Sequence, residues 1–197
     1  MKYFKALFCA LLLVNFAFAL QKAEIETTMQ MRIDESILIL QKTSDKTKAA
    51  AEIFKLFDSI FDYKLMAKLS LSKAYDTLNK EQQDTFDKAF EAQLKKSFTN
   101  KLSLYINEKI IVSNLEQKND KRIFLNAYTI IDGERKDIIF KFYDKVGSWL
   151  IYDVDVLGVS IVQTYRSQFA DLLSNEGFEV LLEKLKTTDF DADKNQK

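Results

Sequence analysis

The sequence predicts a single α+β domain, in which helices come first, an antiparallel sheet follows, and two further helices close the chain. Up to about Leu102 the apolar residues recur every three or four positions, which is the period of a helix packed on one face. From Lys109 to Val156 the chain instead has four stretches rich in Ile, Val, Phe and Tyr, separated by short turns. Runs of helices followed by runs of strands are typical of α+β folds with helices covering one face of the sheet.

The first 19 residues have the features of a cleavable export signal. Lys2 and Lys5 precede the apolar run Ala6–Phe16, and Ala17-Phe18-Ala19 fits the small-x-small cleavage rule. The run is shorter than the roughly 20 residues that a membrane span needs, which favours cleavage after Ala19 over an uncleaved anchor. We therefore expect a signal peptide over residues 1–19, one domain over 20–186 and a polar tail over 187–197.

Composition argues against several kinds of site. The only cysteine, Cys9, leaves with the signal peptide, and the chain contains no histidine. We therefore expect no disulfide, no Ser-His-Asp triad and no imidazole zinc site. The chain has only four glycines and no glycine-rich phosphate loop, and its 29 basic residues balance 29 acidic ones, so nothing favours a nucleic-acid partner. We expect neither a metal nor a cofactor.

Three helices are predicted before the longest one. The first spans Leu20 to about Leu40, the second follows the capping pair Ser44-Asp45, and the third covers Phe61–Leu71. Apolar residues at helical spacing define the first two faces: Ile25, Met29, Ile33, Ile37, Leu40, then Ala49, Ala50, Ile53, Phe54 and Phe57.

The longest helix is predicted to begin after Asn79, with Gln82 three residues later as a variant of the capping box. An unbroken stripe of apolar residues at four-residue spacing follows: Phe86, Phe90, Leu94, Phe98 and Leu102. Such a stripe usually packs into a core, but part of it can also face a ligand, and the spacing fits both interpretations.

Four strands are predicted to form one twisted antiparallel meander, with Asp132-Gly133 as a strong hairpin signal and Lys145-Val146-Gly147 as the next turn. The strands are Lys109–Leu115, Arg122–Ile131, Glu134–Tyr143 and Ser148–Val156. Two helices, Val159–Ser174 and Glu176–Leu185, complete the domain.

The middle strands carry large apolar residues on both faces, more than a sheet covered on one face needs. Two explanations stay open: the first helices wrap the second face, or a cavity between sheet and helices holds an apolar ligand. Asp153 and Asp155 lie two apart on the last strand, opposite the face of Tyr152, Val154 and Val156, so we expect both to be solvated because burying unpaired carboxylates is costly. The case for an enzyme is therefore weak.

Motifs in the second half of the chain resemble the MlaC family, periplasmic proteins that carry phospholipid between the two membranes of diderm bacteria. Gly158-Val159-Ser160 matches the family's glycine-valine-serine step, and Tyr165-Arg166-Ser167-Gln168-Phe169 matches its arginine-serine element, both after a strand with Trp149 and Tyr152. The likeness covers about Phe61 to Lys186. It departs from the family at Asn79, where proline is absent, and at Ala74-Tyr75, where many members have tryptophan.

The resemblance implies a cone-shaped roll similar to nuclear transport factor, with a deep cavity that takes acyl chains and leaves the headgroup in solvent. It implies a periplasmic, monomeric shuttle that maintains outer-membrane lipid asymmetry. Its partners would be phospholipid, an outer-membrane lipoprotein complex, and an inner-membrane ABC transporter with its substrate-binding domain. Two alternatives remain: an enzyme on the same cone-shaped fold, or a periplasmic adaptor that binds no lipid.

The expected lipid-binding residues come from the long helix stripe and from same-face pairs on the strands. They are Phe90, Leu94, Phe98, Leu125, Ala127, Phe140, Phe142, Tyr152 and Val154. Arg166 is the one charged residue of the motifs suited to phosphate. It either contacts the headgroup or takes a local pairing or helix-surface role. No residue is expected to be catalytic.

Overall fold

The computed structural model describes residues 19–102 and 106–187. The expected signal peptide, apart from Ala19, and the expected tail beyond Thr187 lie outside the described residues.

Six α-helices and two short 3-10 helices are described, and the six α-helices fall where the apolar period predicts them. The α-helices are α1 (Ile25–Lys42), α2 (Lys46–Phe57), α3 (Tyr63–Leu71), α4 (Lys80–Lys101), α5 (Ile161–Asn175) and α6 (Phe178–Thr187), and the 3-10 helices are η1 (Lys22–Glu24) and η2 (Ser72–Thr77). Asn79 and Gln82 form the predicted capping box of α4. Asp62 caps α3, so that helix starts later than predicted.

The sheet has five strands in the order β1-β2-β3-β4-β5, all antiparallel. They are β1 (Ile111–Asn119), β2 (Arg122–Ile131), β3 (Glu134–Lys145), β4 (Ser148–Val156) and β5 (Val159–Ser160). Four strands were expected, and the structure adds a fifth, the short β5. Leu157 and Gly158 both have positive φ and turn the chain back, so that Val159 pairs with Val156 before α5 begins.

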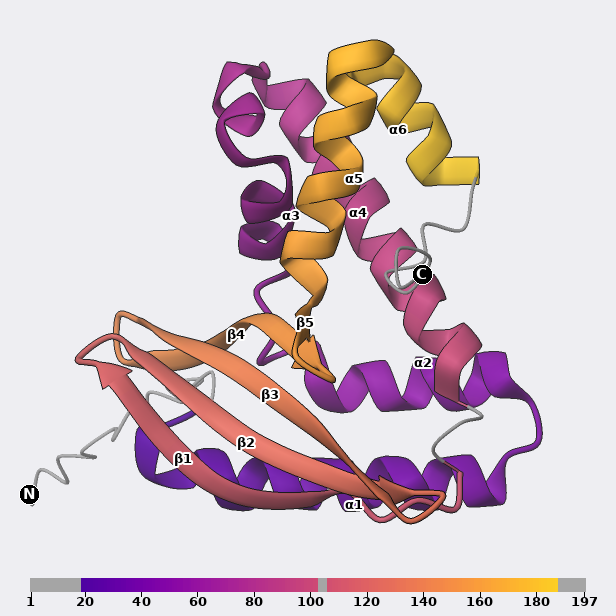
Figure 1. Cartoon of the computed structure of the whole chain (residues 1–197), viewed down its shortest axis with the longest axis vertical. Helices are drawn as coiled ribbons and strands as arrows, with labels where there is room; N and C mark the ends of the chain where they lie inside the picture. Colours follow the sequence, from indigo (N-terminus) through magenta and orange to yellow (C-terminus); the bar gives the residue numbers. More distant parts are fainter. Residues whose placement is uncertain (1–18, 103–105, 188–197) are drawn as a thin grey trace, which may run out of the picture.

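Figure 1 shows two regions joined by α4. In one, α3, α5 and α6 pack around the N-terminal part of α4. In the other, α1 runs alongside the sheet, and α2 lies between α1 and the C-terminal part of α4. The prediction of an α+β fold built from helices and an antiparallel meander is confirmed.

The first region is solidly packed with aromatic rings. Phe86, Phe90 and Phe169 are completely buried, and Tyr165 is almost so. Their ring centroids lie 5.2–6.4 Å apart in edge-to-face and tilted pairs, the geometry that aromatic quadrupoles favour. The second region adds a separate small cluster around Leu40, Ala49 and Ile53.

A bulge in β4 changes which side chains share a face. Phe142 pairs with Ile151, but the preceding Lys141 pairs with Asp153, which leaves Tyr152 as the extra residue. The ring of Tyr152 lies 6.1 Å from that of Tyr143, on the face of the sheet opposite buried Phe142. The expectation that Tyr152 and Val154 share a face is wrong, because one extra residue reverses the alternation.

The expectation that Asp153 is solvated is also wrong, since this residue is only 5% exposed. Its carboxylate accepts hydrogen bonds from the Ser160 hydroxyl at 2.7 Å and from the Val162 amide at 3.1 Å, and it pairs with Lys141 at 2.9 Å. The buried charge is compensated because the strand leads directly into the N-terminus of α5.

Candidate binding cavity

An apolar cavity of about 180 Å³ lies in the second region, between the sheet and the helices α1, α2 and α4. Its apolar lining comes from α1 (Ile33, Ile37, Leu40), α2 (Ile53, Phe54, Phe57), α4 and its C-cap (Phe98, Leu102), the sheet (Ile138, Phe140, Val154, Val156) and the connecting residues Phe61 and Ile110. The cavity separates the main core from the small Leu40 cluster, and Phe57 packs against both. A space walled in this way attracts hydrocarbon and not ions.

The cavity exists because the stripe of α4 meets different neighbours along its length. Phe86, Phe90 and Leu94 are at most 2% exposed, and the rings of α5 and the first residue of α6 pack against Phe86 and Phe90. Phe98 and Leu102, one and two turns further, are only partly buried and line the cavity. The first half of the stripe therefore packs into the core, and the second half lines the cavity where a ligand could bind.

Of the nine residues expected to bind lipid, three line the cavity: Phe98, Phe140 and Val154. Five others lie in the packed main core: Phe90, Leu94, Leu125, Ala127 and Phe142. Tyr152 lies on the far face of the sheet beside Tyr143 and Arg122. Contact with lipid stays a prediction for all nine.

The sequence reasoning missed the walls that α1 and α2 contribute, including Ile37, Phe54 and Phe57. These residues were recognised as apolar helix faces. Their partner surface depends on where the two helices lie relative to the sheet, which no local pattern reveals.

A lysine fixes the outer side of the cavity wall. Lys95 on α4 pairs with Asp58 at 2.8 Å and with Glu91 at 2.7 Å. Its ammonium group also lies 4.7 Å from the ring centre of Tyr63 and 5.4 Å from that of Phe54, two residues of the wall. Burial opposes the charge, but the hydrogen bonds to Asp58 and Glu91 outweigh it and raise the pKa of Lys95. Lys95 thus stays charged and ties the end of α2 to α4.

Arg166 lies away from the cavity lining and binds a helix end. Its Nε and Nη2 groups donate to the Leu69 carbonyl at 2.9 and 2.7 Å, near the C-terminus of α3. A cation at that end satisfies a carbonyl and complements the helix dipole. The structure thus gives Arg166 a local role, and headgroup contact stays a prediction.

The cavity has little capacity for acid–base chemistry. None of its lining residues in the described part of the chain carries a carboxylate, and its polar members are Ser36, Tyr63 and Lys101. Burial, together with the hydrogen bond to Asp58, raises the pKa of Tyr63 far above neutrality, so its hydroxyl remains protonated. Within the described ranges no three acidic, cysteine or histidine side chains gather as a metal site.

Comparison with known proteins gives a consistent result. A family model described as MlaC protein matches residues 30–187. The intermembrane phospholipid transport system binding protein MlaC of Haemophilus influenzae is 23% identical over 120 residues, which are 58% of this chain and 56% of that relative. The match therefore spans little more than half of the relative's length.

A solved structure shares the fold. It is the phospholipid-binding protein of Ralstonia solanacearum in complex with a phospholipid, with a TM-score of 0.72 and 17% identity. The likeness covers 81% of this chain and 93% of that one. Among the described helices of the present chain, none is both long and apolar enough to cross a membrane.

Proposed function

Because the chain belongs to the MlaC family, we propose that it binds phospholipid by the acyl chains and carries it between two membranes. The observation that carries this proposal is the apolar cavity, with walls from three helices and the sheet and no carboxylate in its described lining. Each methylene transferred into such a site contributes about 0.8 kcal/mol, so chains alone supply affinity without a dedicated phosphate site.

The cavity must widen to take whole acyl chains. Its volume of about 180 Å³ is below the roughly 300–1,000 Å³ that ordinary ligand pockets have. The wall formed by α2 and the C-terminal end of α1 is the one suited to move, because its small cluster of Leu40, Ala49 and Ile53 is separate from the main core, to which the earlier α1 residues Ile25, Met29 and Ile33 belong. Movement there leaves the aromatic region around Phe90 intact.

We further propose that the protein works in the periplasm after removal of residues 1–19. The partners with which it exchanges lipid would be an outer-membrane lipoprotein complex and an inner-membrane ABC transporter with its substrate-binding domain. The name of the Haemophilus relative, which describes an intermembrane phospholipid transport system, supports a system of several components. Maintenance of outer-membrane lipid asymmetry would be the outcome of that transport.

Organic extraction of the exported protein, followed by phosphorus analysis and mass spectrometry, tests the proposal. We expect phospholipid in a fixed ratio to protein. Phe140→Arg places a charge against the cavity and should reduce the bound lipid strongly, because a cation is poorly solvated among acyl chains. Ile130→Arg on the neighbouring strand is the matched control, since Ile130 is exposed and outside the cavity lining. Reproducible absence of lipid from the parent protein would favour a protein-binding adaptor.

A further inference from the structure

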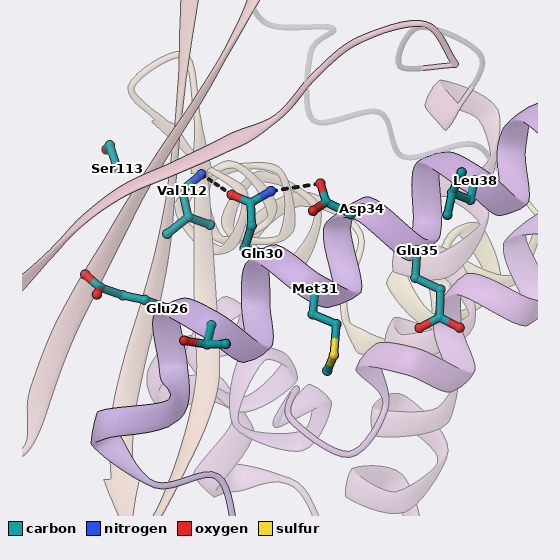
Figure 2. Close-up of a pocket in the computed structure, with 9 residues that line it drawn as sticks. Glu26, Gln30, Met31, Asp34, Glu35, Leu38, Val112 and Ser113 are labelled. Carbon is teal, nitrogen blue, oxygen red and sulfur yellow. Dashed lines mark hydrogen bonds between the residues drawn. The ribbon is translucent and has the colours of Figure 1, made fainter.

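A second hollow lies along a different face of α1 from the one that lines the apolar cavity. It has a volume of about 730 Å³ and follows the outer surface of α1 beside the edge strand β1 (Figure 2). We call it the acidic groove, and its lining is Glu26, Thr27, Gln30, Met31, Asp34, Glu35, Leu38, Val112 and Ser113.

The groove exposes two large apolar side chains. Met31 is 58% exposed and Leu38 is 50% exposed, and they lie seven residues apart, which is two turns of the same helix face. Single exposed apolar residues need no explanation, but a pair aligned within one groove is the pattern of a helix surface that meets a partner.

The groove is also rich in negative charge. Glu26, Asp34 and Glu35 are exposed, and none of them takes part in an ion pair within the described part of the chain. Arg32 is the nearest cation in sequence; its guanidinium donates to the Ser59 hydroxyl at 3.3 Å and interacts electrostatically with Glu35 without forming an ion pair. The chain as a whole is neutral, so this groove is a local excess of negative charge.

Gln30 holds the groove in shape. Its side-chain amide donates to the Ile110 carbonyl at 3.1 Å and to Asp34 at 2.9 Å, and its oxygen accepts from the Val112 amide at 2.8 Å (Figure 2). These bonds join α1 to β1 and satisfy the backbone of the edge strand at this point. An occupant therefore binds through side chains and not by adding a strand.

We propose that the acidic groove docks a basic amphipathic segment of a protein partner, with its apolar side chains on Met31 and Leu38 and its Lys or Arg residues on Glu26, Asp34 and Glu35. The inference rests on the proposed function, because a lipid shuttle must meet a protein partner to receive or deliver its lipid. An anionic membrane surface is disfavoured by the three carboxylates. A symmetric second copy is disfavoured too, because an isologous contact sets the acidic groove against itself.

Binding of a synthetic amphipathic helical peptide, with Leu on one face and Lys on the other, tests this surface by fluorescence anisotropy on the full protein. Glu26→Lys with Glu35→Lys should weaken binding about tenfold or more, and raised salt should weaken the parent similarly. Met31→Ser with Leu38→Ser should have a comparable effect. The matched control is Glu52→Lys with Glu183→Lys, exposed helix positions outside the groove, which should change the affinity by less than about twofold.

Photocrosslinking from position 31 in the exporting cell identifies the natural occupant. The adduct should be a protein segment that is basic and apolar. Equal peptide affinity in the groove and control variants would overturn the proposal, as would adducts only with lipid, with an acidic segment or with a second copy. Lipid extraction from the groove variants should match the parent. If the parent protein itself yields no lipid on extraction, the shuttle function is refuted, but the measured binding of the peptide to the groove remains valid.

Discussion

The two halves of α4 show how one sequence pattern serves two purposes. Phe86, Phe90 and Leu94 are at most 2% exposed, and the rings of Phe169 and Tyr165 pack against Phe86 and Phe90. Phe98 and Leu102 continue the same four-residue spacing but line the cavity, because their neighbours on α1, α2 and the sheet do not fill the space. The spacing determines that a face is apolar, and the partner decides whether it becomes core or binding site.

The largest effect is expected from a substitution in the N-terminal half of α4, which is packed against α5. Phe90→Ala should lower the free energy of unfolding by about 3–5 kcal/mol, since it removes a completely buried ring. Phe98→Ala, one of the cavity walls, should cost about 1 kcal/mol or less because Phe98 is only partly buried. Denaturant unfolding of both variants measures this. Equal losses would show that the halves do not differ.

Asp153→Asn should have the next largest effect, because Asp153 anchors the start of α5 to the sheet. We expect a loss of about 3 kcal/mol, at the lower end for a broken buried pair, since Lys141 keeps its contact with Asp155 at 2.6 Å. Thermal and denaturant melts measure the loss. Lipid bound per folded molecule should not change, whereas any enzymatic turnover abolished by this change would favour the enzyme alternative.

Asp62 joins the two regions and makes stability depend on pH. Its carboxylate caps α3 and accepts from Tyr143 and Lys145 of β3. Burial opposes its charge, but these hydrogen bonds outweigh it and lower the pKa of Asp62. Its contribution is therefore present above the ordinary Asp pKa of about 3.9 and is lost as pH falls through the lower folded value.

Asp62→Asn should cost about 1–3 kcal/mol at neutral pH. It should also flatten the acid dependence of unfolding relative to the parent, a comparison that urea melts across the acidic range provide. A variant with the parental slope would show that Asp62 does not couple the regions.

The smallest effect is expected at an exposed turn of the sheet. Val146 is fully exposed at the turn between β3 and β4, with a φ of 53°, a conformation that β-branched residues rarely adopt. Val146→Asn should raise the free energy of unfolding by about 1 kcal/mol or less, because Asn-Gly suits this hairpin turn. The melting temperature should rise slightly as a result. Lipid content should stay at the parental value. A lowered melting temperature would contradict this view of the turn.

Local chemistry made most of the fold predictable. The apolar period located the helices, Asn79 and Gln82 marked the start of α4, and Asp132-Gly133 marked a hairpin. The bulge at Tyr152 and the short β5 were missed, since each depends on how a strand meets its neighbour. One extra residue in β4 was enough to misplace Tyr152, whereas Asp153 is buried because the start of α5 lies against it.

The candidate site was less predictable because a cavity is a property of packing. The stripe on α4 predicted Phe98, and alternation on the strands predicted Phe140 and Val154. The same rules also selected Phe90 and Phe142, which are buried in solid core. The walls from α1 and α2 had no signal beyond an apolar face, which every core helix has.

A phospholipid with a photoreactive group on one acyl chain tests the central claim most directly. After loading and irradiation, mass spectrometry locates the adducts along the chain. The account predicts adducts at the cavity walls, on α1, on α2, near Phe98 and near Phe140, and none among the rings of α5. Adducts concentrated around Tyr165 and Phe169, or on the far face of the sheet at Tyr152, would contradict it.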